Sequence, residues 1–190
     1  WAASVMGRLG KTFLFDELDR SIQQAVPDQA SSRTRDVQRT LECMHWLAEC
    51  NYEIHFPPSS DISERIIFPV SPNESNGIED ARFVEFSDGA RKTYYATYTA
   101  YSGRAIRSEL IETSDFMSFR LTPLKGAAAR NKGMALFPRK IGGKYAMIAR
   151  QDNENLYLIY SDDLYTWDGG QAVLKPQFPW EFVQIGNCGS

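Results

Sequence analysis

Cysteine and histidine are scarce in this sequence of 190 residues. The three cysteines, Cys43, Cys50 and Cys188, form no C-x-x-C pair, and the two histidines are His45 and His55. An odd number of cysteines at these spacings does not fit a disulfide framework, and so few ligands do not build a zinc site. We therefore predict reduced thiols in a cytoplasmic protein, with no metal site.

Long apolar runs and an excess of basic residues are absent as well. No stretch approaches the ~20 apolar residues that cross a bilayer, and no basic segment followed by an apolar run opens the sequence. Lys and Arg total 21 against 24 Asp and Glu, a net charge of −3. We expect no membrane partner and no nucleic-acid partner. With 43% hydrophobic and 24% charged residues, the composition is that of a globular protein.

The first sixty residues predict helices. Residues 15–26 form a short amphipathic stretch that Pro27 ends, and residues 34–50 form a stronger one. One face of the second stretch carries four apolar side chains at helical spacing: Val37, Leu41, Met44 and Ala48. We assign residues 1–60 to a helical N-terminal segment or insertion.

Residues 61–190 change to a period of two, which is typical of strands. The predicted strands are 65–68, 82–86, 93–101, 144–150 and 156–160. Gly142 and Gly143 predict a two-residue hairpin turn, and residues 87–89 predict a second hairpin. The fold class is therefore mainly β, with an N-terminal helical segment.

A seven-residue pattern occurs twice, as TSDFMSF at 113–119 and as SDDLYTW at 161–167, with an offset of 48 residues. Short antiparallel strands repeating every ~40–50 residues are typical of β-propeller blades; two similar turns in a β-sandwich are the alternative. Residues 61–190 have room for about two to three blades, and a closed propeller needs at least four. We expect an incomplete β-propeller that is part of a longer protein, and that forms a homo-oligomer or needs the remaining blades.

Charge is distributed unevenly. Residues 116–151 contain no Asp or Glu but eight basic residues, and the rest of the chain, with 13 basic and 24 acidic residues, carries −11. The eight are Arg120, Lys125, Arg130, Lys132, Arg139, Lys140, Lys144 and Arg150. Such a window indicates either an anion-binding site or a solvated basic face.

The most acidic motif near a strand is NGIEDAR at 76–82. Side chains alternate along a strand, so Glu79 and Asp80 are predicted to point in opposite directions, one into a central channel and the other towards Arg82. A carboxylic acid near other acids is suited to general acid catalysis. A turn-forming Asp with a structural ion pair is the alternative.

Several of these motifs together resemble glycoside hydrolase family 130, which contains mannoside phosphorylases and mannosidases. The segments SNGIEDARF at 75–83 and YATYTAY at 95–101 are similar to the acid-bearing blade of that family. NKGMALFP at 131–138, SDDL at 161–164 and IG at 185–186 follow in the same order. The resemblance implies a five-bladed β-propeller with its active site in the central channel.

The same resemblance implies roles for individual residues. Asp80 would be the catalytic acid, while Arg130, Asn131 and Arg150 would hold inorganic phosphate with Lys132 beside them. Phosphate is then a co-substrate, and no cofactor is required. All four residues assigned to phosphate, Arg130, Asn131, Lys132 and Arg150, lie within the acid-free basic window at residues 116–151.

Glu79, Tyr98 and Trp180 are secondary candidates for sugar contacts. Where the family has Pro after the acid, this sequence has Ala81, which indicates a divergent subgroup. The function implied is inverting phosphorolysis of β-mannosidic or related bonds in an oligosaccharide, by a longer protein of which these 190 residues alone would be inactive. The alternatives are an inverting hydrolase of the same fold and a non-catalytic carbohydrate-binding propeller.

Overall fold

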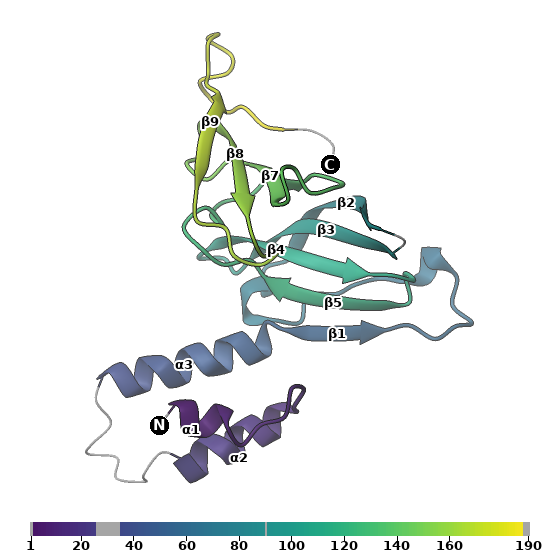
Figure 1. The fold of residues 1–190 in the computed structure, drawn as a ribbon, viewed down its shortest axis with the longest axis vertical. Helices are drawn as coiled ribbons and strands as arrows, with labels where there is room; N and C mark the ends of the chain where they lie inside the picture. Colours follow the sequence, from purple (N-terminus) through teal and green to yellow (C-terminus); the bar gives the residue numbers. More distant parts are fainter. Residues whose placement is uncertain (1, 26–34, 90, 188–190) are drawn as a thin grey trace. The chain divides into compact units, whose positions relative to one another are not determined.

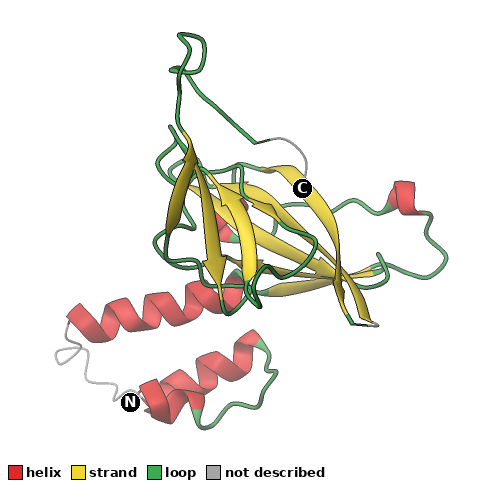
Figure 2. Cartoon of the chain, turned by 45° about the horizontal axis from the view of Figure 1, so that its top comes forward, coloured by secondary structure: helices red, strands yellow, loops and turns green. Residues whose placement is uncertain are grey.

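The computed structural model describes all residues except 1, 26–34, 90 and 188–190. Contacts divide the chain into two compact units, Trp1–Glu49 and Cys50–Ser190. Figures 1 and 2 show that the first unit consists of helices and the second of strands and long loops. The predicted class, mainly β with N-terminal helices, is confirmed.

Three helices make up the first unit: α1 (Ala2–Met6), α2 (Phe15–Ala25) and α3 (Arg35–Glu49). Val5, Leu18, Ile22 and Leu41 are its buried core. The other apolar side chains of the predicted α3 face, Val37, Met44 and Ala48, pack against this core. The helix and its buried face are therefore as the periodicity predicted.

The second unit begins with a five-stranded antiparallel sheet in the order β1-β5-β4-β3-β2. Its strands are β1 (Tyr52–His55), β2 (Ile78–Asp88), β3 (Arg91–Tyr101), β4 (Ile106–Thr113) and β5 (Ser118–Pro123). Asp88 pairs with Arg91 across the β2–β3 turn, and Gly89 in that turn has φ 63°. The predicted hairpin at 87–89 is therefore confirmed.

A four-stranded antiparallel sheet, in the order β6-β7-β8-β9, follows along the chain. Its strands are β6 (Ala135–Leu136), β7 (Tyr145–Ala149), β8 (Leu156–Ser161) and β9 (Gly170–Leu174). Ile141 pairs with Lys144, and the intervening Gly142 and Gly143 have φ 59° and 82°. Two consecutive positive φ angles define the primed turn that the Gly-Gly pair predicted.

One core joins the two sheets. It contains Val84, Phe86 and Leu110 from the first sheet and Met147, Ile159 and Trp167 from the second sheet or the turn after β8. A second core, on the opposite face of the first sheet, contains Ala96, Tyr98, Ile111 and Leu121. The first sheet is thus packed on both faces, which fixes β3, the strand that pairs with β2 and its NGIEDAR motif.

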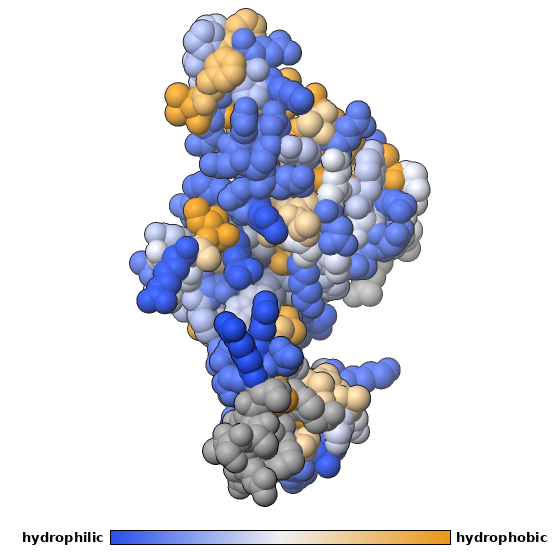
Figure 3. Space-filling view, turned by 90° about the vertical axis from the view of Figure 1, so that its left-hand side faces the viewer, coloured by the Kyte–Doolittle hydropathy of each residue, from blue (hydrophilic) through white to orange (hydrophobic). Residues whose placement is uncertain are grey.

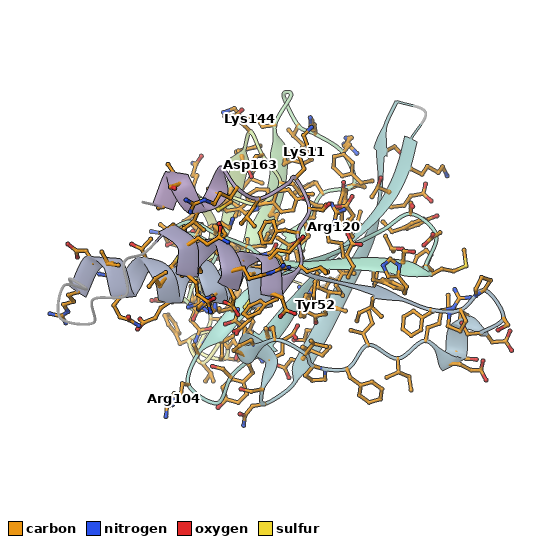
Figure 4. The ribbon with its side chains drawn as sticks, turned by 90° about the horizontal axis from the view of Figure 1, so that it is seen from below. Lys11, Tyr52, Arg104, Arg120, Lys144 and Asp163 are labelled. Carbon is orange, nitrogen blue, oxygen red and sulfur yellow. The ribbon has the colours of Figure 1, made fainter. Side chains whose placement is uncertain are left out.

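The repeated seven-residue pattern forms the same turn twice. Oδ1 of Asp115 accepts hydrogen bonds from the backbone N–H groups of Met117 and Ser118, both at 2.8 Å. Oδ1 of Asp163, labelled in Figure 4, accepts from Tyr165 at 2.7 Å and Thr166 at 2.9 Å. The aromatic residue that closes each copy is buried: Phe119 in one and Trp167 in the other. The pattern is therefore a repeated Asx turn that ends a strand and begins the next segment.

Two local predictions need correction. Residues 65–68 form no strand; Ile66 and Phe68 are exposed, and Arg65 is held by the carbonyl oxygens of Ser60 and Phe116. The strands β4, β5, β6 and β9 were not predicted, and neither was β1, which lies within residues 1–60 and pairs with β5. Its four residues are too few for periodicity to separate a strand from a loop.

No helix in the described part of the chain has the length and apolar character needed to cross a membrane.

Candidate active site

A β-bulge reshapes the NGIEDAR motif. Glu79 pairs with Thr99, but the next pair along β2 is Arg82 with Thr97, so β2 has one extra residue there. Asp80 takes up the irregularity with φ 59°, a left-handed conformation that is uncommon outside glycine. The alternation predicted for Glu79 and Asp80 therefore does not hold, and both side chains are exposed.

The loop at residues 130–133 lies beside this bulge. Nζ of Lys132 lies 2.8 Å from Oε1 of Glu79 and forms an ion pair with it. Asn131, at φ 61°, donates from Nδ2 to the carbonyl of Gln151 at 2.8 Å and accepts at its own carbonyl from Ser108. These contacts hold the loop between the first sheet and the residues that follow β7, and the ion pair of Lys132 joins the loop to the acidic motif.

Two arginines converge on the segment 184–187. Nη1 of Arg82 donates to the carbonyl of Asn187 at 3.1 Å, and Nη1 of Arg150 donates to the carbonyl of Ile185 at 3.1 Å. With its amide oxygen turned towards the guanidinium, Gln184 accepts from both terminal nitrogens of Arg150. Arg82 therefore does not pair with the neighbouring carboxylates, and the expected Glu79 or Asp80 to Arg82 ion pair is replaced by Glu79 to Lys132.

Several polar atoms around Arg150 are buried and have no hydrogen-bond partner among the described residues. They are Nε of Arg150, Oε1 of Gln151, and both amide atoms of Asn187. Arg150 itself is only 4% exposed. Burying such groups unpaired is unfavourable, and an arginine in particular offers a planar fork of donors. This corner supplies donors and acceptors that suit a phosphate or a sugar hydroxyl.

The remaining predicted site residues are placed differently. Arg130 is exposed and forms no hydrogen bond or ion pair with the described part of the chain. Tyr98 is 3% exposed, and its hydroxyl lies between the carboxylates of Glu74 and Glu109. It therefore has no ring face open to a sugar, which corrects its selection as a sugar contact; partners far away in the sequence decide its burial.

Trp180, the other aromatic candidate, is 72% exposed and stacks on Phe178 with ring centroids 4.8 Å apart. Figure 3 shows apolar side chains at the top of the molecule, where the segment after β9 lies. Among the residues that the structure describes, no hydrogen bond or ring contact joins either ring to the bulge.

Sequence reasoning missed the part played by residues 184–187 in holding the two arginines. Only the short IG motif pointed to this segment, and it carries no charge. Within residues 2–25, 35–89 and 91–187, no three His, Cys, Asp or Glu side chains form a group that would hold a metal ion.

The profile of glycoside hydrolase family 130, described as beta-1,4-mannooligosaccharide phosphorylase, matches residues 40–183. A 1,2-beta-oligomannan phosphorylase from Thermoanaerobacter sp. is 33% identical over 132 residues, covering 66% of this chain and 43% of that protein. A beta-1,2-mannobiose phosphorylase from Listeria innocua is 30% identical over 113 residues, covering 57% of this chain and 30% of that protein.

The solved structure of the Listeria innocua beta-1,2-mannobiose phosphorylase, in complex with beta-1,2-mannobiose, is also similar. It superposes with a TM-score of 0.50 and 28% identity, over 57% of this chain and 31% of that one. The chain thus spans less than half the length of each of these relatives.

Proposed function

Because this chain belongs to glycoside hydrolase family 130, we propose that it serves in the inverting phosphorolysis of β-mannosides, with Asp80 as the catalytic acid. The observation that carries the proposal is the 2.8 Å ion pair between Glu79 and Lys132. It supports the proposal because it joins the acidic bulge to the basic loop, as a site that combines an acid with anion-binding groups would require.

Each step of the reaction has a group available. Asp80 gives its proton, by way of a sugar hydroxyl, to the oxygen of the breaking glycosidic bond. Phosphate attacks the anomeric carbon from the opposite face, so the configuration inverts and mannose 1-phosphate leaves with the shortened oligosaccharide. The exposed, left-handed Asp80 suits the role, because the bulge turns its side chain out of the regular strand pattern.

The phosphate is assigned to Arg130, Asn131, Lys132 and Arg150. Among the described residues, Arg130 is exposed and offers an uncommitted guanidinium, while Arg150 has a buried Nε without a hydrogen-bond partner. The planar fork of a guanidinium can donate two parallel hydrogen bonds to two oxygens of one phosphate. Glu79 is half-exposed and is proposed to accept a hydrogen bond from a mannose hydroxyl as well as to hold Lys132.

In the complete enzyme we propose that the two sheets are blades of a five-bladed propeller around this site. The remaining blades, or further copies of the chain, would cover its open edges. Cys43 and Cys50 are free thiols, in keeping with a cytoplasmic location.

The test is to incubate the full-length protein with β-1,2- and β-1,4-mannobiose, with and without inorganic phosphate. We expect mannose 1-phosphate only when phosphate is present, and at least about a thousandfold less of it from Asp80→Asn. Glu85→Gln is the matched control, because it removes an exposed carboxylate from the same strand. Phosphate-independent release of mannose, or full activity in Asp80→Asn, would contradict the proposal.

A second comparison tests the phosphate contacts. Arg130→Ala should raise the KM for phosphate by about tenfold or more, the value of one charge-assisted hydrogen bond, and leave the KM for mannobiose within a factor of about two. Arg139→Ala, an exposed arginine nine positions along the same basic window, should change neither constant. Equal effects of the two substitutions would show that general surface charge is responsible.

A further inference from the structure

A pair of buried carboxylates lies on the first sheet, on the face opposite the inter-sheet core. Glu74 and Glu109 are both fully buried, and the hydroxyl of Tyr98 lies between them, 2.6 Å from Oε1 of Glu74 and 2.8 Å from Oε2 of Glu109. Two buried carboxylates joined by one hydroxyl cannot both be ionised without a large unfavourable interaction. The protons in this cluster can be assigned from its geometry.

Glu74 is surrounded by donors. Its Oε2 accepts from the backbone N–H groups of Val70 and Ser71, both at 2.9 Å, and the hydroxyl of Tyr52 lies 2.9–3.0 Å from its two oxygens. Tyr52, labelled in Figure 4, comes from β1. Four donors, including Tyr98, are what a carboxylate anion requires when it is taken out of water.

Glu109 has fewer donors. Nδ2 of Asn73 donates to its Oε1 at 2.7 Å, and the other oxygen faces Tyr98. Tyr98 has a single hydroxyl proton, and we assign it to Glu74, whose Oε1 is the nearer acceptor at 2.6 Å. The 2.8 Å contact between Tyr98 and Glu109 then needs a second proton, and only the carboxyl group of Glu109 can supply it.

The electrostatics of the cluster agree with this assignment. Burial raises the pKa of Glu109 and the charge of Glu74 adds to the rise, while the hydrogen bond from Asn73, the contact with Tyr98 and the charge of Arg107 act to lower it; the pKa is raised on balance. Burial also acts to raise the pKa of Glu74, but the hydrogen bonds from Tyr98, Ser71, Val70 and Tyr52 outweigh it and the pKa is lowered.

The other titratable neighbours stay neutral. Burial raises the pKa of Cys50 to about 11, and it raises the pKa values of Tyr52 and Tyr98 even further above the usual range. Each of these groups keeps its own proton and adds no negative charge to the cluster. The additional proton between Tyr98 and Glu109 is therefore assigned to the carboxyl group of Glu109.

The cluster lies directly behind the acidic bulge. Tyr98 is the residue of β3 between Thr97 and Thr99, which pair with Arg82 and Glu79 on either side of the bulge. Glu74 ends η2 (Pro72–Glu74), and its carbonyl accepts from the backbone of Gly77, one residue before β2 begins. Both the turn that leads into the bulge and the residue opposite it are thus tied to Glu74, the turn through its backbone carbonyl and Tyr98 through its carboxylate.

We propose that a neutral Glu109 donates its proton to Tyr98, which in turn donates to an ionised Glu74, and that this hydrogen-bond chain positions the Glu79–Asp80 bulge. Tyr98, Glu74 and Glu109 are positioning residues, since none of them is exposed to a substrate. Only the consequence for catalysis rests on the proposed function of Asp80; the protonation state and the anchoring do not.

Infrared difference spectroscopy of the full-length protein at neutral pH tests the protonation. The carbonyl band of a protonated carboxylic acid should be present in the wild type and in the Glu85→Gln control, and absent in Glu109→Gln. Glu109→Gln keeps a neutral group with an N–H donor, so we expect it to fold. A wild-type spectrum without the band, or one that keeps the band in Glu109→Gln, would overturn the assignment.

Hydrogen exchange tests the anchoring without reference to activity. Tyr98→Phe removes the bridging hydroxyl alone, and amide exchange in residues 77–82 should become at least about tenfold faster, the effect of losing one hydrogen bond to a charged group. Exchange at the β7–β8 strands should be unchanged, and Glu109→Gln should stay close to the wild type in both regions. Uniform acceleration across both sheets, or none near the bulge, would overturn the positioning role.

The outcomes separate this inference from the proposed function. If mannoside phosphorolysis is absent while the band and the local exchange effect are present, the proposed function fails and the hydrogen-bond chain stands. If phosphorolysis is present, Tyr98→Phe should lower kcat by about tenfold or more while the KM for phosphate stays within a factor of about two.

Discussion

Nζ of Lys132 lies 2.8 Å from Oε1 of Glu79, and this ion pair joins the bulge in β2 to the loop before β6. The lysine side chain is 35% exposed and that of the glutamate 55%. An exposed ion pair of this kind contributes little to the free energy of folding. Its importance therefore lies in fixing the position of the loop before β6 relative to the bulge.

We predict that Lys132→Met lowers the free energy of unfolding by less than about 1 kcal/mol. In a double-mutant cycle with Glu79→Gln, the coupling energy should be about 0.2–1 kcal/mol and should shrink at high salt. The measurement is urea unfolding of the four proteins. In the control cycle, Glu85→Gln replaces Glu79→Gln; Glu85 pairs with Lys92, so its effect should simply add to that of Lys132→Met. Equal coupling in both cycles would contradict the specific pairing.

The features that the sequence predicted correctly depend on neighbouring residues. The buried face of α3 follows from apolar spacing, and the turn at residues 141–144 from the Gly-Gly pair, because both are fixed within a few residues. The repeated Asx turn is local in the same way, since each Asp binds backbone two and three residues further on.

The features that could not be predicted depend on partners far along the chain. The bulge at Asp80 is a property of the register between β2 and β3, which the sequence of β2 alone does not specify. Tyr98 is buried by carboxylates 24 and 11 residues away, and Arg150 is held by a carbonyl 35 residues away. Alternation correctly identified Tyr98 as a strand residue, and it put Arg150 at the end of a strand that in fact ends one residue earlier, but it could not show what faces either side chain.

Substitutions at Asp80 should separate backbone strain from chemistry. Its φ of 59° disfavours most side chains, so Asp80→Gly should leave stability unchanged or raise it by up to about 1 kcal/mol. Asp80→Val should lower stability by about 1–3 kcal/mol, because a β-branched residue is poorly accommodated there. Asp80→Asn should lie within about 0.5 kcal/mol of the wild type, since Asn tolerates this conformation. Thermal unfolding checks the order; a destabilised Asp80→Gly would contradict the strained backbone.

Gly126 should be intolerant of any side chain. It has φ 98°, and a Cβ atom there would overlap the carbonyl group of the fully buried Trp167. We expect Gly126→Ala to destabilise the protein by about 3 kcal/mol or more, by strain and by displacement of the core tryptophan. Gly142→Asn is the matched control, because Gly142 has φ 59° with open space around it. Tryptophan fluorescence during urea unfolding measures both, and equal stability of the two variants would disprove the close approach.

The neutral Glu109 predicts a definite pH dependence. Burial first, and then the charge of Glu74, raise the pKa of Glu109 above its value in the unfolded chain, so the folded state binds the extra proton. Its contribution to stability is therefore complete below about pH 4.3 and is lost as the pH rises towards the folded pKa. Across that window the free energy of unfolding of the wild type should fall by up to about 1.4 kcal/mol per pH unit relative to that of Glu109→Gln, which has no proton to release.

Glu85→Gln is the control, and its free energy of unfolding should run parallel to that of the wild type above pH 5. The hydrogen bond from Lys92 and then that from Tyr94 lower the pKa of Glu85, so the effect of this substitution on the pH dependence is confined to more acidic solutions. Urea unfolding at a series of pH values decides the matter: parallel curves for the wild type and Glu109→Gln would mean that Glu109 is ionised in the folded protein.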